Sequence, residues 1–328
     1  MERIFHHRRL GQTNIYLILN LLAGQSPQLA TCSGKHPSPI NNETVNVVNQ
    51  EYRILAFKSF HERPRNVELF NDGQTLVVRF EYDETLHPTV SGGPLNGDFE
   101  LEKIQFYWGH YNKNTIGTED PIRNVSFPTE LHVIFRNMKY QDFDQAANKR
   151  DGIAVLAFFF EIFERDNEDY AALTKTVKQV AKPNAVAKLK KPKALWSFIS
   201  FNIFDYYTYT GSLTTPPCSE DVLWIDFQRP IQMSSKQIES FRHLYTDDNT
   251  RMIYTQRPVL KPLRNRTIFD AVLVIDPEDE ATDLHSAIPY VDNLVGAANA
   301  LDSGGICFIF PLFVSSIFTG RVSAKGWN

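Results

Sequence analysis

"KIQFYWGHYN", residues 103–112, alternates in the way a β-strand does. Large apolar side chains stand at positions 104, 106 and 108, and they form one face because successive side chains of a strand point to opposite sides. The other face carries an ammonium, an amide and a phenol, two residues apart: Lys103, Gln105 and Tyr107. This polar face of an otherwise apolar strand is a candidate functional site.

Further strands are predicted on both sides of this stretch. Residues 65–82 indicate two strands around a turn at Asn71-Asp72-Gly73. Residues 130–137 and 153–163 predict two more strands. The second of these is too continuously apolar to face water, so we expect it in the centre of the sheet. Strands dominate and no internal repeat appears, which indicates a mainly β (α+β) class.

Helices are predicted at only a few places. Residues 168–182 have helical spacing, and residues 234–245 begin with a capping box from Ser234 to Gln237. Residues 181–193 hold five lysines and two prolines, and we expect a solvated surface loop there. After Phe269 the composition becomes acidic and then rich in small residues, which predicts a linker.

The composition limits the class of protein. The 328 residues are 42% hydrophobic, with a net charge of −4 and a pI of about 6.2. This is enough apolar sequence for one large core. No basic stretch is interleaved with aromatic residues, so a nucleic-acid partner is not expected. The predicted organisation is an N-terminal extension or signal-like segment (1–29), one folded domain (30–268), and a linker with a hydrophobic tail (269–328).

Three N-glycosylation motifs, at Asn42, Asn124 and Asn265, favour the secretory pathway. The chain starts with a basic segment and a short apolar run at 15–23, which resembles a signal peptide; an irregular extension is the alternative. An apolar run at 306–318 follows small residues, as in a lipid-anchor signal, but it is too short to span a bilayer of about 30 Å. We therefore expect a secreted protein, or one on the extracellular face of the membrane and anchored by this tail; a tail that anchors nothing is the alternative.

Four stretches together carry a family resemblance. They are "SGKHPSPI" (33–40), "FYWG" (106–109) with "GTED" (117–120), "TELHVIFRN" (129–137) and "YYTYTGSLTTPPCSEDVLWIDF" (206–227). Their order and spacing resemble those of the alpha-class carbonic anhydrases over about residues 30 to 268. The resemblance implies a single domain with a large twisted, mostly antiparallel sheet and short peripheral helices.

In that family three histidines hold zinc, two at i and i+2 on one strand and the third on the neighbouring strand. Residues two apart on a strand point the same way, so the three imidazoles form three corners of a tetrahedron. The fourth corner is water, whose pKa zinc lowers to about 7, and the resulting hydroxide attacks carbon dioxide.

The resemblance places the three ligand positions at Gln105, Tyr107 and His132, so it implies that only one histidine is present. A glutamine oxygen is a weak ligand for a metal that favours nitrogen and sulfur. A tyrosine would have to lose a proton whose ordinary pKa is about 10. We therefore expect no bound metal and no other cofactor.

The positions around the ligands also depart from the family. Lys103 and Thr255 stand where the resemblance implies a glutamine and an asparagine that orient the ligands, while Glu130 matches the partner of the third histidine. Arg63 stands at the position of the proton-shuttle histidine, and an arginine does not give up its proton near neutral pH. Lys103 either lines the cavity or replaces the positive charge of zinc.

Other parts of the family site are matched. Thr214 and Glu119 match the pair that orients the zinc-bound hydroxide. Without zinc, we interpret them as a buried hydrogen-bonded pair that stabilises the fold. The apolar wall of the carbon dioxide pocket is matched at four positions: Val155, Leu213, Val222 and Trp224. This wall is core whether or not zinc binds.

The cysteines add to the resemblance. Cys32 and Cys218 match the positions of the disulfide of extracellular family members. Such a bond closes a long loop, so its stabilisation could reach about 4–5 kcal/mol. Two separate buried thiols are the alternative interpretation.

The sequence is consistent with three functions. The first is a carbonic anhydrase-related protein that has lost hydratase activity and binds an unknown protein. The second is an active zinc-dependent carbonate dehydratase, with zinc as cofactor. The third is a cleft that binds a small anion near Lys103, Arg63 and Arg65; scattered surface charges are the simpler explanation for these three residues.

Overall fold

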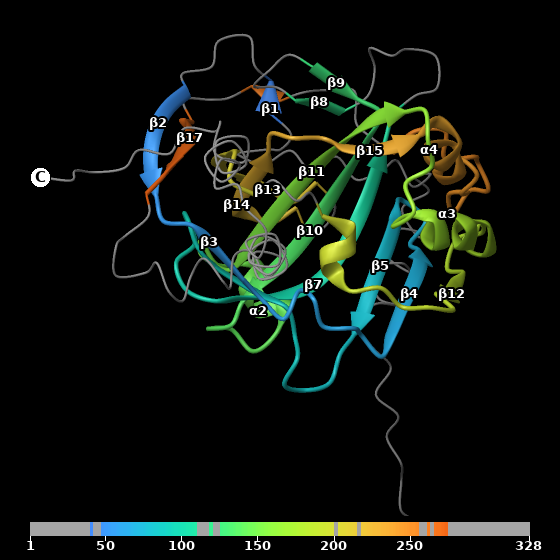
Figure 1. The fold of residues 1–328 in the computed structure, drawn as a ribbon, viewed down its shortest axis with the longest axis horizontal. Helices are drawn as coiled ribbons and strands as arrows, with labels where there is room; N and C mark the ends of the chain where they lie inside the picture. The colour runs from blue at the N-terminus through green and yellow to red at the C-terminus, as the bar shows by residue number, and fades with distance from the viewer. Residues whose placement is uncertain are drawn as a thin grey trace, which may run out of the picture.

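The computed structural model describes residues 40–41, 47–109, 118–120, 125–199, 203–214, 218–255, 261–262 and 266–274, and the structural statements below concern these residues. Figure 1 labels their elements along the chain. The strands are β1 (Ile40–Asn41), β2 (Val47–Tyr52), β3 (Leu55–Lys58), β4 (Asn66–Asn71), β5 (Leu76–Glu81), β6 (Thr89–Gly92), β7 (Phe99–Trp108), β8 (Thr118–Asp120), β9 (Val125–Phe127), β10 (Thr129–Asn137), β11 (Ile153–Phe163), β12 (Val186–Lys188), β13 (Tyr206–Ser212), β14 (Glu220–Phe227), β15 (Ile231–Ser234), β16 (Lys261–Pro262) and β17 (Ile268–Leu273). The helices are α2 (Phe143–Ala147), α3 (Ala171–Val177) and α4 (Ser235–Phe241), with 3-10 helices η1 (Lys178–Val180) and η2 (Leu195–Phe198).

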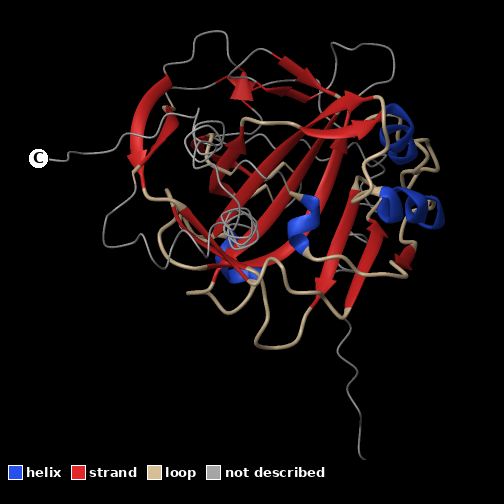
Figure 2. Cartoon of the chain, in the orientation of Figure 1, coloured by secondary structure: helices blue, strands red, loops and turns tan. Residues whose placement is uncertain are grey.

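Thirteen of the described strands form one sheet, and strands far outnumber helices in Figure 2. The main path runs β12-β4-β5-β7-β10-β11-β14-β13-β17-β2, and β3, β6 and β15 pair beside it. Most neighbours are antiparallel, whereas β11 pairs in parallel with β14 and β15, and β17 pairs in parallel with β2. The predicted class, a large and mostly antiparallel sheet with a few short helices, is confirmed.

The two faces of the sheet bury two separate apolar clusters. The larger cluster contains Ile104, Phe106 and Trp108, together with core residues of α3, η1, η2 and α4. The smaller cluster lies on the other face and includes residues of α2, β11, β13 and β14. The predicted division of β7 into two faces is therefore correct, because its apolar set packs under the helices and its polar set faces the smaller cluster.

The predicted central strand also agrees with the structure. Strand β11 lies between β10 and β14, and its first eight residues are buried. The predicted turn joins β4 to β5, and α4 begins with the predicted capping box, in which Ser234 and Gln237 each bond to the other's backbone. No helix of the described residues is long and apolar enough to cross a membrane.

Two boundaries predicted from the sequence need correction. The segment 181–193 is not wholly a loop, because β12 pairs with β4 and Leu189 is buried in the larger cluster. The predicted end of the domain at residue 268 falls inside β17, which pairs with β13 and β2. Ile268 and Leu273 are 0% and 3% exposed, so the folded part continues at least to Leu273.

Candidate functional site

Strands β7 and β10 bring the predicted ligand positions together. In their antiparallel register, His132 lies opposite Gln105, and Glu130 lies opposite Tyr107. Directly opposed residues of an antiparallel pair share one face of the sheet. Gln105, Tyr107 and His132 are 2%, 6% and 3% exposed, so the three side chains are nearly sealed from solvent.

The Tyr107 hydroxyl connects two other polar side chains. The Thr214 hydroxyl donates to the Tyr107 oxygen at 3.2 Å, and the Tyr107 hydroxyl donates to Gln105 Oε1 at 3.3 Å. Buried polar groups are costly unless they are hydrogen-bonded, and these bonds provide partners inside the site. The phenol therefore lies between the loop that follows β13 and the polar face of β7.

His132 is held by a carboxylate and two aromatic rings. Its Nε2 lies 2.6 Å from Glu130 Oε1. Its ring centroid lies 4.5 Å from that of Tyr107 and 4.8 Å from that of Trp224, which meets it edge-on. These contacts fix the orientation of the imidazole between β7 and β14. The predicted partnership of Glu130 with His132 is present as a direct contact.

The predicted apolar wall forms one contiguous group. Val155, Leu213, Val222 and Trp224 all belong to the smaller apolar cluster and are at most 5% exposed. Strand register explains this, because Val155 lies opposite Trp224 across the parallel pair β11–β14. The wall stands beside His132 through the Trp224 ring.

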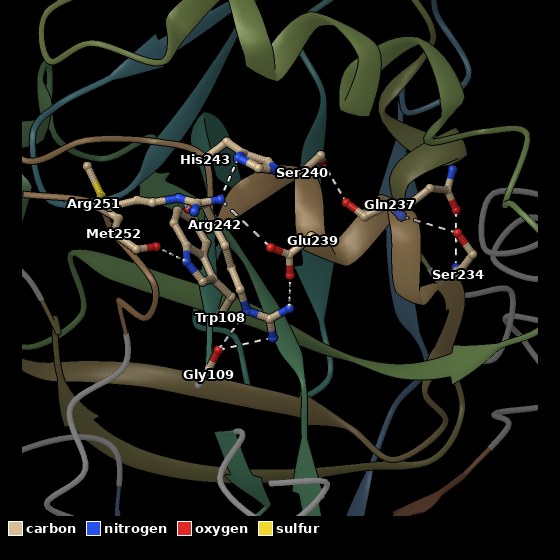
Figure 3. Close-up of polar contacts among 10 residues, drawn as sticks. All are labelled: Trp108, Gly109, Ser234, Gln237, Glu239, Ser240, Arg242, His243, Arg251 and Met252. Atoms are coloured by element: carbon tan, nitrogen blue, oxygen red, sulfur yellow. Dashed lines mark hydrogen bonds and ion pairs between the residues drawn. The ribbon is translucent and has the colours of Figure 1, made fainter. Parts of the chain in front are cut away.

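Residues that follow helix α4 anchor the end of β7 (Figure 3). The Trp108 indole donates to the Met252 carbonyl at 2.8 Å. Arg242 donates to the Gly109 carbonyl through Nε (3.2 Å) and Nη2 (3.1 Å), and its Nη1 lies 3.0 Å from a Glu239 carboxylate oxygen. A buried guanidinium needs such partners, so this arrangement fixes the strand end directly after Tyr107.

Thr255 contacts the same strand end by its backbone and hydroxyl. Its N–H donates to the Trp108 carbonyl at 2.9 Å, and its hydroxyl accepts from the Trp108 N–H at 3.0 Å. The Thr255 oxygen is thus bonded to the backbone of β7. The sequence resemblance located Thr255 near the site, but it gave no signal of this pairing.

The three basic residues of the small-anion hypothesis have different surroundings. The Lys103 ammonium lies 5.6 Å from the centre of the Phe143 ring, and burial lowers the pKa of Lys103. Arg65 forms an ion pair with Asp83, and Arg63 is exposed. Lys103 therefore contacts an aromatic ring and Arg65 pairs with a carboxylate, so neither side chain depends on a bound anion for a partner.

Several predicted residues lie outside the described residues or side chains. These are Cys32, the motifs at Asn42, Asn124 and Asn265, and the Glu119 side chain. Cys218 is disulfide-bonded, and its partner is also outside the described residues. The Cys32–Cys218 pairing and the Thr214–Glu119 pair remain predictions.

The donor groups define what the site can do chemically. Gln105, Tyr107 and Thr214 supply neutral oxygens, and His132 supplies the one imidazole beside them. In the part of the chain that the structure describes, no three His, Cys, Asp or Glu side chains form a group suited to a metal ion. The Tyr107–Thr214 bond, which the sequence could not show, is the principal addition of the structure to the predicted site.

Comparison with known proteins gives one family. A sequence model of eukaryotic-type carbonic anhydrases matches residues 25–272. Carbonic anhydrase 7 of Mus musculus is 34% identical over 242 residues, covering 72% of this chain and 88% of the relative. Mitochondrial carbonic anhydrase 5B of Homo sapiens is 34% identical over 214 residues (62% and 63%). Carbonic anhydrase 15 of Mus musculus is 29% identical over 217 residues (64% and 66%).

Proposed function

The chain belongs to the eukaryotic-type carbonic anhydrase family, and we propose that it is a carbonic anhydrase-related protein that binds a partner and does not hydrate carbon dioxide. The observation that carries the proposal is the position of the Tyr107 hydroxyl between Thr214 and Gln105. At the positions matched to the family, Thr214 would orient a zinc-bound hydroxide. Here its hydroxyl donates to a phenol.

The residues present do not fit a zinc ion. Zinc sites in catalysis use three protein ligands, mostly nitrogen or sulfur donors, and leave one position open. Gln105 offers a neutral amide oxygen, and Tyr107 offers a phenol that is already in a hydrogen bond with it. The Tyr107 ring also packs against His132 at 4.5 Å, so the phenol fills space beside the one imidazole. These side chains therefore do not supply the ligands that a catalytic zinc ion requires.

The surroundings of the site support the same proposal. The Glu130–His132 contact and the apolar wall stabilise the sheet whether or not a reaction takes place. An arginine side chain has only hydrogen-bond donors and no acceptor, so Arg63 cannot replace a shuttle histidine. What the fold retains is a folded domain in which the side chains at the three ligand positions are buried, which suits an interaction module better than a hydratase.

An active zinc enzyme is the second candidate function, and family membership is the observation that favours it. The two candidates differ in metal content. We expect protein produced with zinc in the medium and purified without chelators to contain far less than one zinc ion per chain. Stoichiometric zinc that dialysis does not remove would support the enzyme and contradict our proposal. The variant Lys103→Gln/Gln105→His/Tyr107→His provides a control that should gain zinc under the same treatment.

We also propose that the chain passes through the secretory pathway, with Cys218 paired to Cys32. The disulfide at Cys218 and the three N-glycosylation motifs support this. Peptide mapping without reduction, on protein from a eukaryotic secretory host, should recover the Cys32–Cys218 peptide. Recovery of Cys218 joined to Cys307, or of a free Cys32 thiol, would refute the pairing.

The partner is proposed by class only. An unknown protein is favoured over a small anion, because Arg65 already pairs with Asp83 and the Lys103 ammonium lies over an aromatic ring.

A further inference from the structure

Positive charge is concentrated in one segment of this acidic protein. Residues 170–204 contain seven lysines and no aspartate or glutamate, although the net charge of the whole chain is −4. Removing these seven charges from the total leaves −11 for the rest of the chain. Six of the seven lysines are exposed, and we call them the lysine surface: Lys175, Lys178, Lys182, Lys188, Lys190 and Lys191.

The fold exposes these lysines on neighbouring segments of the chain. Lys175 lies in α3 and Lys178 in η1, and the opposite side of α3 buries Leu173 and Val177 in the core. Lys182 follows two residues after the end of η1. Lys188 and Lys190 are two residues apart and flank the buried Leu189, so their side chains point away from the core. Strand β12 contacts η1, and Figure 1 shows α3 and β12 at the same edge of the molecule.

The lysine surface is not neutralised by the described residues around it. Lys193 is the exception in this segment, because its ammonium lies 2.8 Å from Asp169 Oδ1. None of the six lysines of the surface forms an ion pair with another described residue. Glu68 lies opposite Lys188 in the β12–β4 register, and its carboxylate is also 3.8 Å from Arg79.

Protection of the sheet edge explains only part of this arrangement. In the described sheet β12 is an edge strand that pairs with β4, and lysine on an edge strand prevents unwanted strand pairing. Lys188 serves that purpose. The other five lysines lie outside β12, where no strand edge needs protection: Lys175 in α3, Lys178 in η1, Lys182 between η1 and β12, and Lys190 and Lys191 after the strand.

We propose that the lysine surface binds a sulfated polysaccharide of the heparin type. A flexible linear chain of sulfates can contact several exposed ammonium groups on neighbouring segments, and lysine acts as a point charge toward such anions. The surface lacks exposed aromatic side chains on which bases could stack, which disfavours single-stranded nucleic acid. Its one exposed apolar residue, Val186, is too little for insertion into a membrane. The choice of an extracellular polyanion rests on the secretory location proposed above, whereas the binding itself depends on neither that location nor the zinc site.

The test measures binding of the full chain to immobilised heparin at physiological salt, for wild type and two variants. Lys188→Gln/Lys190→Gln/Lys191→Gln removes three charges from the lysine surface. Its matched control removes three exposed lysines away from α3 and β12: Lys58→Gln/Lys139→Gln/Lys149→Gln. We expect wild type to bind, the first variant to lose about 10-fold or more in affinity, and the control to stay within about twofold. Equal thermal unfolding of the three proteins excludes a folding defect.

Four outcomes would overturn the proposal. They are no binding by wild type at physiological salt, equal losses in both variants, undiminished binding to desulfated heparin, and equal or tighter binding to single-stranded DNA or to phosphatidylserine vesicles. The last would assign the surface to another polyanion. None of these outcomes depends on zinc content or hydratase activity, so failure here is distinguishable from failure of the proposed function.

Discussion

Replacing Tyr107 by phenylalanine tests whether the phenol is an integral part of the site. The change keeps the ring against His132 and removes only the oxygen that is bonded to Gln105 at 3.3 Å and to Thr214 at 3.2 Å. A neutral hydrogen bond contributes a net of about 0.5–1.5 kcal/mol, and each of these two is expected near the lower value because its O···O distance exceeds the usual range of about 2.5–3.0 Å. We therefore expect a loss of roughly 1–2 kcal/mol in the free energy of unfolding.

Urea denaturation of the intact-disulfide protein measures this loss, and it should appear as a lower midpoint with an unchanged slope. Tyr170→Phe is a control, because its buried hydroxyl donates to the Phe198 carbonyl at 2.6 Å and its loss should cost more. The double variant Tyr107→Phe/Thr214→Val should be less destabilised than the sum of the single variants by about 0.5 kcal/mol or more. A neutral Tyr107→Phe that is additive with Thr214→Val would refute the hydrogen-bonded arrangement.

Three further predictions concern the metal positions, the buried lysine and the end of the domain. The double variant Gln105→His/Tyr107→His should bind zinc weakly, because Lys103 cannot accept a hydrogen bond from an imidazole N–H. Adding Lys103→Gln should tighten zinc binding by about 10–100-fold in a competition assay. A triple variant that binds no zinc would mean that the strand register is wrong. Lys103→Met should raise the free energy of unfolding at pH 7, because burial lowers the pKa of Lys103 in the folded state below its ordinary value of 10.5 in the unfolded chain. The gain should shrink as the pH approaches 10.5, and a gain independent of pH would refute this cause. A chain ending at residue 266 should have a free energy of unfolding lower by on the order of 3–6 kcal/mol than a chain ending at residue 274, because β17 buries Ile268 and Leu273. Equal melting temperatures of the two chains would contradict the place of β17 in the sheet.

Alternation in strand β7 was sufficient to predict which side chains face the core. The apolar residues at 104, 106 and 108 pack in the larger cluster, because the two-residue period of a strand fixes the face of every side chain once the strand is identified. The family resemblance added the pairing partner, and the structure places His132 opposite Gln105. Periodicity alone could not have given that register.

The contacts of the site could not be predicted, because they join residues far apart in the chain. Thr214 and Tyr107 are separated by 107 residues, and Thr255 and Trp108 by 147. Local patterns contain no information on such pairs. Short edge elements were missed for a different reason. Strand β12 has only three residues, with Val186 and Lys188 exposed, so its composition resembles that of a loop.

The sequence predicts the end of the domain too early, because the change in composition is a stronger signal than the strand pattern before it. Acidic residues become frequent after residue 274, and this trend obscured the buried positions Ile268, Ala271 and Leu273. Strand β17 is held by pairing with β13 and β2, and β2 lies more than two hundred residues earlier in the chain. A strand completed by such a distant partner carries little signal in its own sequence.

Carbon dioxide hydration by the full-length protein tests the central claim most directly. Stopped-flow measurement with a pH indicator, with zinc added to saturation, compares the observed rate with the uncatalysed rate and with an active family member. We predict no zinc-dependent rate above the uncatalysed reaction, because the Tyr107 phenol is bonded to Thr214 and Gln105 where a zinc-bound hydroxide would have to form. Zinc-dependent turnover that a sulfonamide abolishes would contradict the account.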